Sequence, residues 1–203
     1  APEAIAAARD AGLRVAFVTN NASRPPEAVA ENLVHLGVPA WTEDVVTSAQ
    51  AAARIVAARL APESRVLMLG GDGLGRALTE EGLVAVRSLD EGEGAAVVTG
   101  YGPDVLWRDI MQAAVRIRDG LWWVASNTDL SLPTSFGAAP GHGVLVRMLE
   151  QFTGVTPEVA GKPARALLDE AVRRVGGTRP LMVGDRLDTD IEGAHNAGLP
   201  SLL

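Results

Sequence analysis

A chain of 203 residues, 47% of them hydrophobic, is long enough to bury a substantial core in one domain or in two small ones. The net charge of −7 argues against nucleic acid or an anionic membrane as a main partner, and no apolar run approaches the roughly 18 residues that a membrane span requires. Cysteine is absent, which excludes disulfide and thiol chemistry and leads us to expect a cytoplasmic protein.

The N-terminal part of the chain alternates between helical and strand patterns. The apolar run from Leu13 to Val18 predicts a buried strand, and Val45 to Thr47 predicts a second, shorter one. Ser48 is expected to cap the helix that follows it. Helices are predicted for residues 3–11, 25–36 and 48–60. This alternation is typical of an α/β fold with a doubly wound, Rossmann-like parallel sheet.

Pro62 marks a boundary at which a second α/β unit begins. Its strands are predicted at residues 65–69, 95–99 and 121–125. Its helices are predicted at residues 103–118 and 144–152, with a shorter one that begins after residue 75 and ends near residue 81. A polar loop at 126–134 and a glycine-rich segment at 137–143 precede the last helix. We therefore predict a smaller α/β cap domain over residues 62–156, inserted into a discontinuous core of residues 1–61 and 157–203.

The most informative stretch begins at Leu181, where an apolar run ends in Gly184 and three acidic residues follow: Asp185, Asp188 and Asp190. This order predicts a buried parallel strand, a tight turn and the start of a short helix. Ligands of open α/β sheets bind at the carboxyl ends of the strands, and Mg²⁺ takes few carboxylates beside waters and phosphate oxygens. We therefore predict that Asp185 binds metal and that Asp188 only caps the helix.

Three predicted strands end in polar loops: one at Thr19 and Asn20, one at Gly161 and Lys162, and one at Asp185. In a single parallel sheet these loops would lie on one edge, where a hydroxyl, an ammonium and a carboxylate could converge on a phosphate. Lys162 is expected at a helix N-terminus, which would add the helix dipole to its charge. Each loop alone is also an ordinary turn, but the combination favours a phosphate site.

These loops carry a family resemblance. Residues 17–21 (FVTNN), 160–163 (AGKP) and 183–190 (VGDRLDTD) resemble motifs II, III and IV of the haloacid dehalogenase-like superfamily, in its NagD-like subclass IIA. Residues 126–129 and 140–143 resemble the cap of that subclass. The resemblance implies a Mg²⁺-dependent hydrolase, a phosphatase that works through an aspartyl-phosphate intermediate, and the subclass often forms homodimers. Within the subclass, the chain resembles actinobacterial glycerol-3-phosphate phosphatases.

The resemblance also implies roles for individual residues. Lys162 would clamp the phosphate, Asp185 would bind the metal and Asp190 would be an acidic residue behind them. The cap loop would cover the leaving group, and His142 would either meet substrate or lie in an exposed turn. Phosphate or substrate contacts are thus expected from Thr19, Asn20, Asn21, Lys162, Asn127, Asp129 and His142. A small phosphorylated polyol or sugar is favoured as substrate, and nucleotides and pyridoxal phosphate remain open.

One family motif is missing. Motif I, Asp-x-Asp-Gly, should precede Thr19, but Asp10 is the only aspartate in residues 1–18 and lies in a predicted helix. The nucleophile would therefore lie upstream, and we expect the full protein to begin before Ala1.

Two other classes of protein compete with this interpretation. Residues 70–75 (GGDGLG) follow a strand, with Asp90 beyond them, as in a dinucleotide-binding protein, but Arg76 breaks the Gly-x-Gly-x-x-Gly pattern and tight turns explain the glycines. A non-catalytic phosphate-binding module is the other alternative. Three of the four tryptophans are expected in packing or in a self-association interface: Trp107, Trp122 and Trp123.

Overall fold

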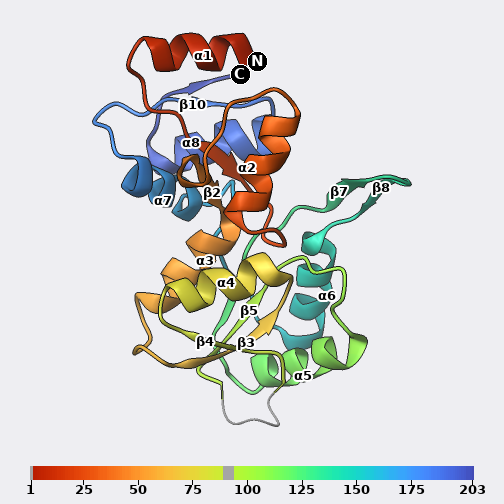
Figure 1. Ribbon diagram of the computed structural model, residues 1–203. Coiled ribbons are helices and arrows are strands. Elements are labelled where there is room, and N and C mark those ends of the chain that lie inside the picture. The colour runs from red at the N-terminus through yellow and green to blue at the C-terminus, as the bar shows by residue number, and fades with distance from the viewer. Residues whose placement is uncertain (1, 89–93) are drawn as a thin grey trace.

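The computed structural model describes residues 2–88 and 94–203, in which helices alternate with mostly parallel strands (Figure 1). The helices are α1 (Pro2–Asp10), α2 (Pro26–His35), α3 (Ser48–Ala57), α4 (Asp72–Glu80), α5 (Trp107–Arg118), α6 (His142–Thr153), α7 (Ala166–Val175) and α8 (Glu192–Ala197). The strands are β1 (Phe17–Thr19), β2 (Val45–Thr47), β3 (Arg65–Leu69), β4 (Val84–Val86), β5 (Ala96–Thr99), β6 (Trp123–Ala125), β7 (Ser131–Thr134), β8 (Gly137–Pro140), β9 (Glu158–Val159), β10 (Met182–Val183) and β11 (Ser201–Leu202). The predicted α/β class is confirmed. None of the helices in the two described ranges is long and apolar enough to cross a membrane.

The largest sheet of the described residues is parallel and five-stranded, in the order β4-β3-β5-β6-β9. Along β3, Val66 and Met68 pack into a core cluster with α3 and α4, whereas Leu67 and Leu69 pack into a second cluster with α5 and α6. Both faces of the strand are therefore buried, which explains its unbroken apolar sequence. Figure 1 shows α4 over one face of this sheet, with α5 and α6 on the other side.

Strand β9 corrects the predicted sheet arrangement. Glu158 and Val159 pair with Val124 and Ala125 of β6, so β9 is the edge strand of the five-stranded sheet. It does not join β1 and β10, which pair instead with β2 and β11. The three polar loops therefore do not lie on one edge of one sheet, because hydrogen bonding to β6 makes β9 part of the five-stranded sheet. The division into core and cap at residues 61 and 157 stays a prediction.

The strands that lead into two of the polar loops are less buried than predicted. Leu13 is 62% exposed, residues 13–16 form no strand, and β1 itself is only half-buried. Val183 in β10 is 64% exposed. Within the described residues, β1 and β10 each pair with a neighbour on one side only, so neither strand is covered as a central strand would be.

A hairpin and an earlier helix start replace the predicted loop after β6. Strands β7 and β8 pair antiparallel, with Ser131 opposite Pro140 and Thr134 opposite Gly137. The hairpin projects from the body of the molecule at the right of Figure 1. The sequence did not predict these two strands, because the prolines and glycines within them are typical of loops. His142 is the first residue of α6 rather than part of a glycine-rich loop.

The three tryptophans considered for an interface, out of four in the chain, have different environments. Trp123 is buried, and its Nε1 donates to Thr99 Oγ1 at 3.0 Å. Trp122 is partly buried, with the Arg59 guanidinium 4.5 Å from its ring centroid. Trp107 is exposed at the start of α5. Packing therefore accounts for Trp122 and Trp123, whereas Trp107 is exposed and could take part in an interface.

The glycines at residues 70–75 allow two backbones to come together. A Cβ on Gly71 would lie 2.8 Å from the Ser23 carbonyl oxygen, and one on Gly73 would lie 2.6 Å from the Arg24 carbonyl carbon. Gly73 N donates to Ser23 O at 3.0 Å. The start of α4 thus rests on the loop after β1, and this contact, rather than tight turns alone, requires glycine. The dinucleotide interpretation loses its main support, and Asp90 lies outside the described residues.

We predict that Gly73→Ala destabilises the protein by about 1–3 kcal/mol, because its Cβ must displace the backbone of Arg24. Gly75→Ala is the matched control in the same helix: its Cβ would meet only the flexible end of Met68, at 3.4 Å, so a neutral effect or a gain of up to about 1 kcal/mol is expected. Urea unfolding of both variants measures the difference. Equal effects of the two substitutions would contradict the close approach.

Candidate active site

A buried ion pair lies at the centre of the candidate site. Lys162 Nζ donates to Asp190 Oδ1 at 2.7 Å and to the Val18 carbonyl oxygen at 3.3 Å. Both charged side chains are at most 10% exposed. A buried charge is tolerated only with such partners, so the pair determines where the ammonium group lies. Lys162 is in a turn, and α7 begins only at Ala166, so the predicted helix-dipole contribution is not supported.

Asp190 also holds the loop after β10. Its Oδ2 accepts hydrogen bonds from the backbone N–H groups of Asp185 and Arg186, both at 3.2 Å. A π-helical segment, Leu187–Ile191, turns the chain so that Asp190 lies beneath these groups, and a Cβ on Gly184 would overlap Asp190. One carboxylate therefore joins the Lys162 ammonium to the Asp185 loop.

The other two aspartates of this stretch face solvent. Asp185 is exposed directly after β10 and Gly184. Asp188 forms an ion pair with Arg186 at 2.8 Å, and the hydrogen bond from that guanidinium lowers the pKa of Asp188. Its carboxylate thus pairs with Arg186 instead of acting as the predicted simple helix cap. Residues 2–88 and 94–203 contain no group of three or more His, Cys, Asp or Glu side chains arranged to hold a metal ion.

The loop after β1 is shaped by its own polar side chains. Asn21 N–H donates to Thr19 Oγ1 at 3.1 Å, which leaves the hydroxyl hydrogen of Thr19 available to an acceptor. Asn21 Oδ1 accepts from the N–H groups of Ser23 and Arg24, at 2.9 and 3.2 Å. These bonds form an Asx-type turn that leads into α2.

Asn20 contacts several segments at once. Its Oδ1 accepts from Lys162 N at 2.8 Å, and its Nδ2 donates to Lys162 O at 3.0 Å and to Asp129 Oδ1 at 3.1 Å. Its backbone carbonyl accepts from Ser48 Oγ at 2.6 Å and from Asn127 Nδ2 at 2.8 Å. Ser48 can do this because Thr47, not Ser48, caps α3, through a capping box with Gln50.

His142 is buried beneath this cluster, at 4% exposure. It therefore does not lie in an exposed turn. Its ring Nδ1 is 2.8 Å from the carbonyl oxygen of Asn127, which is also buried. Burial lowers the pKa of His142 to about 4, against a smaller opposite effect of the Asn127 carbonyl. The ring is thus neutral at physiological pH and supports the loop that carries Asn127.

The structure brings most of the predicted residues together. Hydrogen bonds link the loops that carry Thr19 to Asn21, Asn127 and Asp129, Lys162, and Asp185 with Asp190, although these loops follow strands of different sheets. The sequence argument missed Ser48 and the Val18 carbonyl, which carry no recognisable motif. For Lys162 the composition offered an additional signal, because it is the only lysine and the other 17 of the 18 basic residues are arginines.

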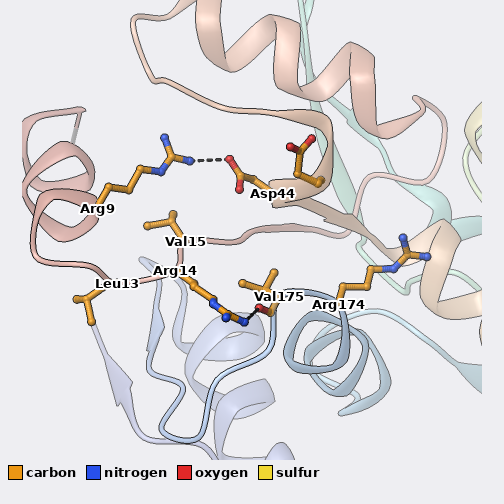
Figure 2. Close-up of a pocket in the computed structure, with 8 residues that line it drawn as sticks. Arg9, Leu13, Arg14, Val15, Asp44, Arg174 and Val175 are labelled. Atoms are coloured by element: carbon orange, nitrogen blue, oxygen red, sulfur yellow. Dashed lines mark hydrogen bonds and ion pairs between the residues drawn. The ribbon is translucent and has the colours of Figure 1, made fainter.

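A separate pocket lies elsewhere, between α1 and the end of α7 (Figure 2). Figure 2 shows Arg14 donating to Val175 O, at 2.8 Å, and Arg9 paired with Asp44, at 2.6 Å. The pocket shares no residue with the cluster around Lys162; it is lined by Arg9, Leu13, Arg14, Val15, Glu43, Asp44, Arg174 and Val175.

Comparison with known proteins agrees with these features. Residues 1–84 match the haloacid dehalogenase-like hydrolase family, and residues 159–203 match the HAD-hydrolase-like family. The chain is 36% identical over 198 residues to the 5'-nucleotidase YutF of Bacillus subtilis, covering 96% of this chain and 75% of that protein. The chain therefore belongs to the haloacid dehalogenase-like hydrolases.

A second relative is the D-glycerol 3-phosphate phosphatase of Mycobacterium tuberculosis, 51% identical over 190 residues. The alignment covers 94% of this chain and 54% of that protein, so the chain spans about half the length of this relative. The crystal structure of the mycobacterial glycerol phosphate phosphatase in complex with magnesium superposes with a TM-score of 0.90 at 51% identity, covering 94% of this chain and 58% of the solved one.

The buried His142 predicts an acid-dependent loss of stability. The folded state keeps the ring neutral down to about pH 4, whereas the unfolded chain takes up a proton near pH 6.5. The contribution of His142 is therefore fully present above pH 6.5 and is lost as the pH falls toward 4. The loss is on the order of 3 kcal/mol.

Unfolding free energies between pH 4 and 7 test this prediction. His142→Gln should flatten this part of the profile whatever its overall stability. His195→Gln, at an exposed position in α8, is the control and should keep the wild-type slope. An unchanged slope in His142→Gln would show that His142 is not held neutral by burial.

Proposed function

We propose that this protein is a magnesium-dependent phosphatase that hydrolyses a small phosphate monoester through an aspartyl-phosphate intermediate. The observation that carries the proposal is the meeting of three chemically distinct groups in one linked set of loops. These are the Thr19 hydroxyl, the Lys162 ammonium and the Asp185 carboxylate, with Asp190 tying the last two together. Membership of the haloacid dehalogenase-like hydrolases and the names of its relatives, which are phosphatases and a 5'-nucleotidase, support the same reaction.

Thr19 and Lys162 can bind the phosphoryl group. An ammonium group has three N–H donors, and Lys162 uses two of them on Val18 and Asp190, so a third can serve a phosphate oxygen. The Thr19 hydroxyl can donate a second hydrogen bond, and Asn21 keeps that hydroxyl in place. Such preorganised donors stabilise the charge that develops on the phosphoryl oxygens during transfer.

Asp185 would hold the Mg²⁺ ion. Asp185 is exposed, and its backbone N–H donates to the same Asp190 carboxylate that pairs with Lys162. Mg²⁺ commonly uses one or two carboxylates together with waters and phosphate oxygens. One exposed carboxylate therefore fits as part of such a site. The bound ion would neutralise charge on the phosphate. The mycobacterial relative has been crystallised in complex with magnesium, which supports this assignment.

The nucleophile belongs, by the family resemblance, to a strand between β1 and β10. The unpaired edge that each of these strands has within the described residues supports this placement. Lys162, which bonds both Val18 in β1 and Asp190 behind β10, would then lie beside the attacking carboxylate.

Glycerol 3-phosphate or a sugar phosphate is the substrate that we favour. The support is the similarity to the mycobacterial D-glycerol 3-phosphate phosphatase and to the acid sugar phosphatase of Staphylococcus aureus, which is 35% identical over 193 residues. The hairpin β7–β8, which follows Asp129 directly, would contact the leaving group. A cytoplasmic location and a homodimer stay predictions.

In the full-length protein, Lys162→Ala should lower kcat/KM for p-nitrophenyl phosphate by about 100- to 1000-fold, as expected when one preorganised donor is removed. Arg165→Ala is the matched control, because Arg165 is an exposed cation nearby that pairs with Asp169 four residues further on. A loss below tenfold with Lys162→Ala, in a folded protein, would contradict the phosphate role.

Asp185→Asn should remove the dependence of hydrolysis on Mg²⁺ together with most of the activity, because the amide is a poor magnesium ligand. Asp188→Asn removes an exposed aspartate of the same loop, one that pairs with Arg186, and should retain the Mg²⁺ requirement. Titration of activity with MgCl₂ compares them. Wild-type turnover and an unchanged Mg²⁺ requirement in Asp185→Asn would reject the metal assignment.

Replacing residues 131–140 by the hairpin of a relative should change the ranking of natural substrates. Pocket contacts of this kind are worth about 10- to 200-fold between related substrates. Hydrolysis of p-nitrophenyl phosphate should change little, because the phosphate loops and Asn127 are left intact. Equal losses on all substrates would indicate that the hairpin has only a structural role.

A further inference from the structure

We infer that Asn20 is a positioning residue, whose side-chain amide sets Lys162 and Asp129 in place and makes no contact with phosphate. The inference rests on the proposed function, because it assigns Asn20 a role in the same site. It replaces the expectation that the Asn20 side chain binds phosphate.

The hydrogen bonds of the amide lead to this role. A carboxamide has two N–H donors, and Asn20 Nδ2 directs them at Lys162 O, 3.0 Å away, and Asp129 Oδ1, 3.1 Å away. Its Oδ1 accepts from Lys162 N at 2.8 Å. No donor is left for a phosphate oxygen, so the side chain acts through Lys162 and Asp129.

The surrounding backbone is built to receive this side chain. A Cβ on Gly161 would lie 2.7 Å from Asn20 Oδ1 and 2.6 Å from Ser126 O, so only glycine lets the strand-end loops approach so closely. The carbonyl of Asn20 is held from two further directions, by Ser48 Oγ and Asn127 Nδ2. Segments from β1, α3, β6 and β9 are thus joined at one residue.

This arrangement determines what Lys162 can reach. Asn20 bonds both the N–H and the C=O of Lys162, which fixes the backbone from which the long side chain extends. The ammonium then meets Val18 O and Asp190. The third bond ties Asp129 of the cap loop to the same amide. The phosphate loop and the cap loop therefore keep a fixed relation to each other.

A double-mutant cycle in the full-length protein tests the inference. Asn20→Ala should lower kcat/KM for p-nitrophenyl phosphate by about 10- to 100-fold. In a Lys162→Ala background the same substitution should cost less than about twofold, because its effect passes through Lys162. An equal cost in both backgrounds would show that Asn20 does not act through Lys162 and would overturn the inference. Asn196→Ala, which removes an exposed bond to Pro163 O in the same turn, controls for general loosening.

A second measurement does not depend on activity. An amine-reactive acylating reagent should label Lys162 several-fold faster in Asn20→Ala than in wild type or Asn196→Ala, scored by mass spectrometry on the peptide that contains residue 162. An unchanged labelling rate in a folded Asn20→Ala protein overturns the inference. A wild-type protein without phosphatase activity would reject the proposed function, whereas the labelling result would still decide the role of Asn20.

A reciprocal exchange covers the case in which Asn20→Ala does not fold. Asn20→Asp alone places two carboxylates together and should lose activity and stability. Adding Asp129→Asn recreates an amide–carboxylate pair with donor and acceptor reversed, so melting temperature and kcat should recover in part. If the second substitution improves neither melting temperature nor kcat over Asn20→Asp, the Asn20–Asp129 hydrogen bond does not contribute to stability or activity.

Discussion

The buried contact between Lys162 and Asp190 is the interaction on which the rest of the site depends. Removing either partner would leave an uncompensated charge in a region with at most 10% exposure. Asp190 uses its second oxygen on the N–H groups of Asp185 and Arg186, so the same carboxylate places both the cation and the loop proposed to bind metal. The position of Asp185 therefore follows from the pairing of Lys162, and not from the strand before it, which is largely exposed.

Close packing of loops is the second constraint. Gly71 and Gly73 let the start of α4 rest on Ser23 and Arg24, and Gly161 lets the turn before Lys162 approach Asn20. A Cβ at any of these positions would lie within 2.8 Å of a backbone atom of the neighbouring loop, so a side chain there would force the loops apart. The loop after β1, which we propose binds phosphate, is therefore held between segments that belong to the predicted cap and the predicted core.

Much of the fold could be predicted from sequence, but strand pairing could not. The strands at β2, β3, β5 and β6, and most helices, follow from apolar runs and their periodicity. Strand β9 is two residues long, and only hydrogen bonding to β6 reveals its sheet. The hairpin was missed because Pro133 and Gly137 resemble loop residues, and His142 was misplaced because glycines surround it. Local patterns do not encode which neighbour a short strand will choose.

The sequence by itself determined the α/β class, the family motifs and the identity of the chemical groups at the site, because these depend on residue type and spacing. The tertiary structure alone decided which groups are free to meet a ligand. It commits the amides of Asn20 and Asn127 to internal hydrogen bonds, buries the His142 ring and leaves Thr19, Lys162 and Asp185 with unused capacity. The physical reason is that hydrogen-bond saturation and burial at the site arise from contacts between segments as far as 144 residues apart, and no local sequence pattern records such contacts.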